Sequence, residues 1–265
     1  PGAGVPDPDR VGRREPGGGP VTVRATLATA GRVLGQLRHD RRTVALLLVV
    51  PCLLMVLFKY VYAGTPQIFD RVGLPMLGVF PLVIMFLVTS IAMVRERTSG
   101  TLERLLTTPM ARGDLLAGYA LAFGLVATAQ AGLAAAVALG PLGLSVAAGV
   151  GVVVLLAVVN ALLGMALGLF LSAFAVTEFQ AVQFMPAVIL PQVLLCGLLT
   201  PRSAMPAGLR WISDVLPLSY AVDALTAATR SATVTGGMWG DLGIIGGCGL
   251  AALALGATTL RRRSA

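Results

Sequence analysis

The chain has 265 residues, of which 56% are hydrophobic and only 12% are charged, and its mean hydropathy is +0.86. About a quarter of the residues of a soluble domain are charged, so this composition excludes an ordinary water-soluble fold and indicates a protein solvated largely by lipid. The net charge of +8 would suit nucleic acid. Most basic residues, however, flank long apolar runs instead of forming a water-facing surface, so we expect no nucleic-acid partner.

Two short polar segments precede the first apolar run. Residues 1–20 are rich in proline and glycine and cannot bury enough apolar surface to offset the entropy of ordering, which predicts a disordered tail. In residues 21–42 apolar side chains recur at steps of three and four, and Arg24 and Arg32 lie off that stripe. The pattern predicts an amphipathic helix at the membrane interface. A merely basic leader ahead of the first span is the alternative.

Six apolar runs follow, and most are close to the roughly 20 residues that cross a bilayer. They lie at 43–58, 72–94, 115–139, 146–176, 181–200 and 242–260. The predicted fold is an all-α polytopic membrane protein with six transmembrane helices. The spans and their short loops make up one membrane domain over residues 43–265.

The boundaries of the six helices can be predicted from local signals. We expect them at 43–61, 73–94, 115–139, 146–171, 181–199 and 242–260, the last after Trp239 and Asp241. Pro75 and Pro81 predict a kink or a broken turn in the first half of the second span. Asp114 is the expected N-cap of the third span. Gly164 and Gly168 have the spacing of a close helix–helix contact, a spacing that a chain with 32 glycines also produces by chance.

The basic residues set the orientation. With both termini in the cytosol, 15 of the 20 Lys and Arg residues lie on the cytoplasmic side, as the positive-inside rule expects. Residues 200–236 then lie outside; they carry three prolines and five charged residues, which predicts short outer helices that could dip partway into the membrane. The second cytoplasmic loop, 172–180, holds no Arg or Lys, and we interpret its Glu178 as a water-facing residue in preference to a contact with a partner.

The sequence lacks the signatures of several catalytic sites. Its only lysine, Lys59, lies within an apolar run, so the chain has no phosphate-binding GxxxxGK[ST] loop. One histidine and few acidic residues provide no metal cluster and no catalytic triad. These observations disfavour an enzyme. They favour a transport subunit that is driven by a separate ATPase. There are two alternatives. One is an ion-coupled secondary transporter, which is disfavoured because the spans hold almost no charge at mid-depth. The other is a non-transporting membrane scaffold.

Residues 95–109, between the second and third spans, have the features of a short amphipathic helix. Thr101 can cap it, Glu103 suits its first turn, and Pro109 closes it. Its apolar face consists of Leu102, Leu105 and Leu106. Such a helix could dock into a groove on a soluble partner. A solvated loop whose charges only set the topology is the alternative on these grounds.

The same segment resembles the cytoplasmic loop of ABC-2-type permeases, whose pattern is roughly R-[DE]-x-x-x-G-T-L-E-x-L-x-x-[TS]-P. The matching residues are Arg95, Glu96, Gly100, Thr101, Leu102, Glu103, Leu105, Thr108 and Pro109. Residues 216–225 are also similar to the run that precedes the last span in that family, with Pro217, Tyr220 and Asp223 among the matched positions. The two motifs stand in the expected order, and the resemblance covers about residues 25–262.

The resemblance implies a function and a set of partners. It implies the permease subunit of an ATP-driven exporter of a hydrophobic or amphiphilic substrate (drug, lipid or glycolipid) in the cytoplasmic membrane of a bacterium. Residues 95–109 would be the coupling helix that contacts the ATPase subunit, which is present in two copies. ATP and Mg would bind to that ATPase, with no cofactor in this chain.

The expected partners further include a second permease subunit, identical or closely homologous, and membrane lipids. Residues 200–236 would form outer re-entrant helices. The subfamily looks similar to the daunorubicin-resistance-type permeases of actinobacteria.

Overall fold

The computed structural model of the protein describes residues 23–99 and 112–262. Within this part of the chain there are helices and no strands, and six helices are long and apolar enough to cross a membrane. This confirms the predicted all-α fold with six candidate spans. The spanning helices are α2 (Arg41–Val61), α3 (Pro66–Thr98), α5 (Arg112–Leu139), α6 (Val150–Ser172), α7 (Glu178–Leu195) and α10 (Gly236–Arg262). The shorter elements are α1 (Val23–His39), the 3₁₀ helix η2 (Arg202–Ala204), α8 (Ala207–Val215) and α9 (Pro217–Arg230).

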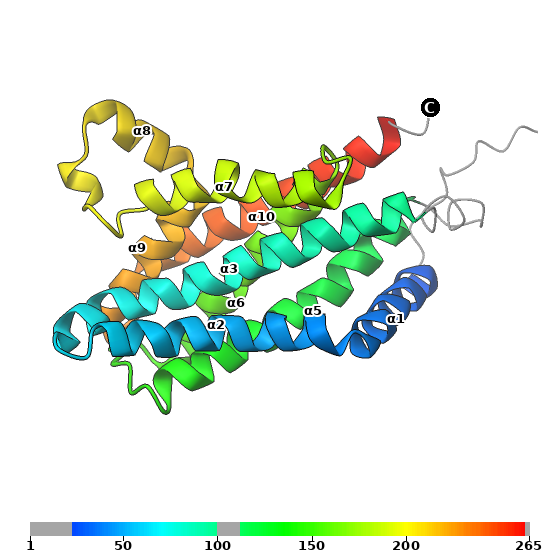
Figure 1. Ribbon diagram of the computed structural model, residues 1–265. Coiled ribbons are helices and arrows are strands. Elements are labelled where there is room, and N and C mark those ends of the chain that lie inside the picture. The colour runs from blue at the N-terminus through cyan, green and yellow to red at the C-terminus, as the bar shows by residue number, and fades with distance from the viewer. Residues whose placement is uncertain (1–22, 100–111, 263–265) are drawn as a thin grey trace, which may run out of the picture.

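The helices form an elongated bundle with two distinct ends (Figure 1). One end, here called the α1 end, holds α1 together with the end of α3, the α6–α7 connection and the end of α10. The other end, here called the α8 end, holds the α2–α3 turn and α8. Successive spans therefore run in alternating directions, as expected of a six-span protein. The predicted tail, residues 1–20, lies outside the described residues.

Helix α3 is longer than the sequence predicted. It has 33 residues instead of the expected 73–94, which corresponds to about 50 Å of helix at 1.5 Å per residue. A hydrocarbon core is about 30 Å thick, so the helix extends beyond it. The additional turns at its C-terminal end carry Arg95 and Arg97 and bring these charges to the α1 end of the bundle.

The predicted break at the prolines of α3 is not observed. The helix continues through Pro75 and Pro81, and both residues are buried. Proline removes a backbone hydrogen bond and crowds the preceding turn, but a neighbouring helix can satisfy the carbonyl that is left. Pro81 leaves the carbonyl of Leu77 without its helical donor; Asn160 of α6 donates its Nδ2 to the adjacent carbonyl, that of Gly78, at 2.7 Å and so adds an interhelical polar contact in the same turn.

Helices α3 and α6 pack closely through two glycines. An added Cβ on Gly164 would lie 2.8 Å from the Cα of Leu82, and one on Gly168 would lie 2.5 Å from the carbonyl oxygen of Phe86. Thr89 adds a polar contact, because its hydroxyl also lies 3.3 Å from the carbonyl oxygen of Met165. Gly164 and Gly168 thus mark a real helix crossing, which their spacing alone could not establish.

Helix α1 is separate from α2. Asp40 lies between them and caps α2, because its carboxylate accepts hydrogen bonds from the backbone N–H and the hydroxyl of Thr43 at 3.1 and 2.6 Å. The face of α1 that packs on the bundle is centred on Thr29, Ala30 and Val33. The predicted apolar stripe consists of Val23, Leu27, Ala30, Leu34 and Leu37. Its member Ala30 lies on the packed face, whereas Val23 and Leu27 are exposed. The placement of α1 at a membrane surface stays a prediction.

Several other boundaries differ from the expected ones, including the start of α6 at Val150 instead of 146 and the end of α7 at Leu195 instead of 199. Helix α5 begins at Arg112, so Asp114 is not its N-cap; it is a residue of the first turn, only 1% exposed, where a carboxylate suits the helix dipole. Helix α7 begins at Glu178 because Thr177 caps it, accepting a hydrogen bond from the backbone N–H of Gln180 at 3.2 Å. Helix α10 begins at Gly236 and therefore contains Trp239 and Asp241, which were expected to precede it.

Candidate functional site

The predicted coupling segment is described only in part. Arg95 and Glu96 lie in the last turns of α3. The other predicted positions, Gly100, Thr101, Leu102, Glu103, Leu105, Leu106 and Pro109, fall outside the described residues. The geometry of the site therefore comes from the end of α3 that leads directly into this segment.

Arg95 joins α3 to α7. Its guanidinium donates two hydrogen bonds to the carboxylate of Glu178, at 2.9 and 3.0 Å. The two side chains are 61% and 43% exposed, so solvent screens the pair and its contribution to stability is modest. Glu178 is thus partly exposed to water, as the sequence predicted, and it also has a specific partner, Arg95, 83 positions away in the sequence.

Glu96 joins α3 to α1. Its carboxylate accepts a hydrogen bond from Arg32 at 2.8 Å, and the second arm of the same guanidinium donates to the hydroxyl of Tyr119, on α5, at 2.9 Å. The Arg32 and Glu96 side chains are 28% and 12% exposed. Burial opposes the charge on Arg32, but the hydrogen bond and the negative charge of Glu96 outweigh it and raise the pKa of Arg32. Arg32 therefore keeps its positive charge at this half-buried position.

Arg97 joins α3 to α6. Its guanidinium donates to the carbonyl oxygens of Ser172 and Ala173, the latter at 3.4 Å. These carbonyls belong to the C-terminal end of α6, where the helix dipole favours a cation.

The three residues Arg95, Glu96 and Arg97, here called the α3 anchor, contact three different neighbours because of helix geometry. Successive side chains project about 100° apart around an α-helix. Consecutive positions can therefore reach helices on separate sides, here α7, α1 and α6. The end of α3 is therefore linked by side-chain contacts to all three helices.

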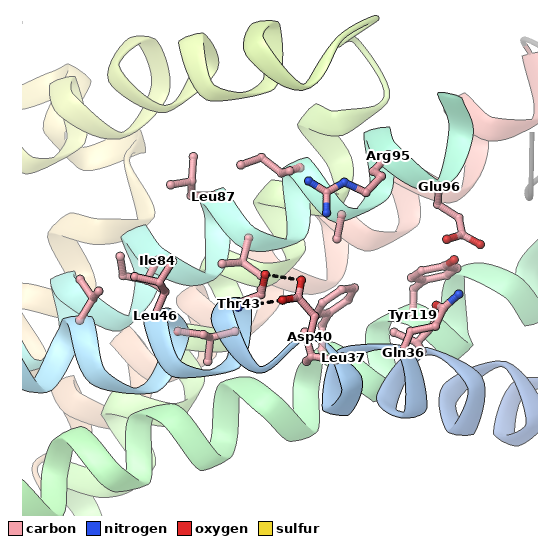
Figure 2. Close-up of a pocket in the computed structure, with 17 residues that line it drawn as sticks. Gln36, Leu37, Asp40, Thr43, Leu46, Ile84, Leu87, Arg95, Glu96 and Tyr119 are labelled. Atoms are coloured by element: carbon pink, nitrogen blue, oxygen red, sulfur yellow. Dashed lines mark hydrogen bonds between the residues drawn. The ribbon is translucent and has the colours of Figure 1, made fainter. Parts of the chain in front are cut away.

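A cavity of about 580 Å³ lies beside the anchor, between α1, α2, α3 and α5 (Figure 2). Polar side chains line the part near the α1 end and aliphatic side chains line the rest. The polar group consists of Gln36, Asp40, Thr43, Arg95, Glu96 and Tyr119. The volume is within the range of small-molecule binding sites, about 300 to 1,000 Å³.

The matched positions of the second motif surround one arginine at the α8 end. Pro217 is the first residue of α9, and the hydroxyl of Tyr220 donates to the carbonyl of Asp214 at 2.6 Å. Arg202 forms ion pairs with both Asp214 and Asp223 and lies 5.6 Å from the ring centroid of Tyr220. Burial raises the pKa of Asp223, and the charge of Arg202 opposes that shift. This cluster holds η2, α8 and α9 together.

The sequence analysis did not identify Arg202 and Asp214 of the cluster at the α8 end, or Arg32 and Tyr119 beside Glu96, as functional. Arg32 and Tyr119 complete the α3 anchor, yet each lies in a separate element and no local pattern links them to Glu96. Within the described residues no three His, Cys, Asp or Glu side chains are grouped so that they could hold a metal ion.

Comparison with known proteins agrees with these observations. Residues 25–229 match the family model described as ABC-2 type transporter. The chain is 28% identical over 137 residues to the probable multidrug ABC transporter permease YbhR of Escherichia coli (strain K12), an alignment that covers 52% of this chain and 37% of that protein. It is 27% identical over 138 residues, 52% of its length, to ABC transporter G family member 20 of Dictyostelium discoideum, and covers 19% of that relative. The chain thus aligns with only a minor part of each of these two relatives.

Proposed function

The chain belongs to the ABC-2 type transporter family, and on that premise we propose that it is the membrane-spanning permease subunit of an ATP-driven exporter. The energy would come from a separate ATPase, present in two copies, that binds ATP and Mg. The substrate would be hydrophobic or amphiphilic, and the site of action would be the cytoplasmic membrane of a bacterium. Residues 95–109 would be the segment that contacts the ATPase.

The observation that carries this proposal is the α3 anchor. A push on the segment that follows α3 would reach α7, α1 and α6 through the contacts of Arg95, Glu96 and Arg97. A permease that is driven from one end needs such a rigid connection, because the motion must spread to several spans at once. A solvated loop would not require three consecutive side chains to be held by three different elements.

The distribution of buried surface leaves two helix faces that a second permease subunit could cover. Within an apolar 18-residue stretch of each span, only 17% is buried in α2 and in α7, whereas 61% is buried in α3. Both exposed helices pack against α3. We propose that a second copy, or a close homologue, covers part of these faces and that substrate crosses at the interface.

The test is charge reversal in the coupling segment. Glu103→Lys should abolish ATP-dependent export of a panel of fluorescent amphiphiles from proteoliposomes that contain the chain and its co-purified ATPase. Membrane insertion should be unchanged, because Glu103 lies outside the six apolar runs of the sequence. Arg24→Glu, at an exposed position of α1, is the matched charge reversal and should leave export intact.

Two outcomes would contradict the proposal. Normal export by the Glu103→Lys variant would show that the coupling assignment is wrong. If no ATPase co-purifies with the chain, the scaffold is favoured. If the chain also moves substrate with an ion gradient alone, the secondary transporter is favoured.

A further inference from the structure

The cavity between α1, α2, α3 and α5 has the two-part lining of an amphiphile site. Its apolar part is formed by side chains such as Leu46, Ile84 and Leu87, which extend along α2 and α3 away from the α1 end (Figure 2). Along α2 the lining runs from the cap residue Asp40 to Val50, about 15 Å at 1.5 Å per residue. A ligand with a polar head and an elongated apolar body matches this arrangement.

The charge balance of the polar part points to a cationic head. Two of the charged residues that line it are already paired, Arg95 with Glu178 and Glu96 with Arg32. Asp40 lines the same cavity, and no Lys or Arg among the described residues forms an ion pair with it. Arg95 also attracts Asp40 at longer range. Counted with their partners, however, the charged groups are three carboxylates (Asp40, Glu96 and Glu178) and two guanidinium groups (Arg32 and Arg95), so the net charge around the polar part is negative.

The carboxylate of Asp40 also has room for a ligand. It accepts a hydrogen bond from the backbone N–H of Thr43 on one oxygen and from the hydroxyl of Thr43 on the other, and a carboxylate offers about four acceptor positions. The hydroxyl and the backbone N–H of Thr43 lower the pKa of Asp40, so the group is ionised at neutral pH. An ammonium group would find both charge and free acceptor positions there.

We propose that this cavity binds an amphiphile whose cationic head lies at Asp40 and whose apolar body lies between α2 and α3. The head would lie next to Arg95 and Glu96, so an occupied cavity contacts the α3 anchor directly. The interpretation of this cavity as a site for transported substrate rests on the proposed function, whereas the binding itself does not. An exogenous cationic amphiphile and a lipid with an amine headgroup share the required chemistry.

The experiment measures binding without any ATPase. The full chain in nanodiscs of phosphatidylcholine and phosphatidylglycerol is titrated with rhodamine 6G, a fluorescent cationic amphiphile, and fluorescence anisotropy reports binding. Asp40→Asn removes the charge and keeps the cap, because Asn is as good an N-cap as Asp. It should weaken binding by about tenfold or more, as expected when a hydrogen bond to a charged group is lost.

Two further variants make the result specific. Asp70→Asn removes an exposed carboxylate at the opposite end of α3 and should bind the dye as the wild type does. Leu87→Trp fills the apolar part of the cavity and should weaken binding of the dye even though every charge is kept. Dodecyltrimethylammonium should displace the dye, and dodecyl sulfate should not.

Several results would overturn the proposal. They are unchanged affinity in Asp40→Asn, equal loss in Asp70→Asn, or displacement by dodecyl sulfate as effective as by dodecyltrimethylammonium. If added phosphatidylethanolamine weakens dye binding to the wild type, the resident ligand is the amine lipid; if it has no effect, the site takes exogenous amphiphiles. Failure of dye binding while an ATPase still co-purifies would reject the site and leave the proposed permease function standing.

Discussion

The contact between Arg32 and Glu96 is the best-buried ion pair in the described part of the chain. Both side chains are mostly shielded, at 28% and 12% exposure, whereas Arg95 and Glu178 are 61% and 43% exposed. Removal of one member of a shielded pair leaves the other charge without compensation, which is more costly than the loss of an exposed pair. Among the contacts of the α3 anchor, the ion pair with α1 therefore contributes more to stability than the ion pair with α7.

Charge reversal tests this difference at the residue scale. Glu96→Arg or Arg32→Glu alone should reduce the free energy of unfolding by about 1 to 3 kcal/mol, because each leaves like charges together at a half-buried position. Arg95→Gln, the control, should lower it by no more than about 0.5 kcal/mol. The measurement is the thermal transition in detergent, followed by the reactivity of Cys196, which is fully buried in the folded chain. The double reversal should recover at least half of the loss, and equal destabilisation by the control would contradict the assignment.

At the scale of the elements, α3 is the central helix. It packs on α2, α5, α6, α7 and α9, and it is the most buried of the candidate spans. Its tightest contact is with α6, where Gly164 and Gly168 allow the two backbones to approach. In lipid there is little hydrophobic drive to bring helices together, so close packing of small residues has a larger role.

Substitution of these glycines should therefore depend strongly on position. Gly164→Ala places a methyl group against the backbone of Leu82 and should cost about 1 to 3 kcal/mol of stability, as overpacking does. Gly151→Ala, in the same helix but with nothing within 4 Å of the added Cβ, should be neutral or slightly stabilising because Ala has the higher helix propensity. The readout is the detergent melting temperature of the two variants. Equal melting temperatures would show that the α3–α6 crossing does not depend on Gly164.

At the scale of the whole molecule, the two ends of the bundle have different chemistry. The α1 end holds the α3 anchor and the polar part of the cavity, and the α8 end holds the cluster around Arg202. The proposed function requires the α1 end to face the cytosol, where an ATPase has access to ATP. The positive-inside rule favours the same orientation.

Cysteine labelling tests this orientation. In a background without Cys52, Cys196 and Cys248, which are all free, Thr101→Cys should react with a membrane-impermeant maleimide only in inside-out vesicles. Ser203→Cys, an exposed position at the α8 end, should react in intact cells. The opposite pattern would invert the topology and remove the basis of the coupling proposal.

The sequence by itself determined the properties that depend on local composition. Six spans follow from the lengths of the apolar runs, and the all-α class follows because a helix satisfies its own backbone hydrogen bonds in lipid. The expected place of the coupling segment and of the outer motif also came from contiguous residues. Local capping rules were less reliable, since Asp114 lies within α5 instead of capping it, and α7 begins just after Thr177, earlier than expected.

Only the tertiary structure decided which distant residues meet. Glu96 and Arg32 are separated by 64 positions, and Arg95 and Glu178 by 83. Hydropathy shows that a segment enters the membrane, but it carries little information on which neighbour that segment will pack against, because lipid and protein solvate an apolar face almost equally well. The α3 anchor and the cavity beside it depend on that choice of neighbours, which is why neither could be predicted from one sequence.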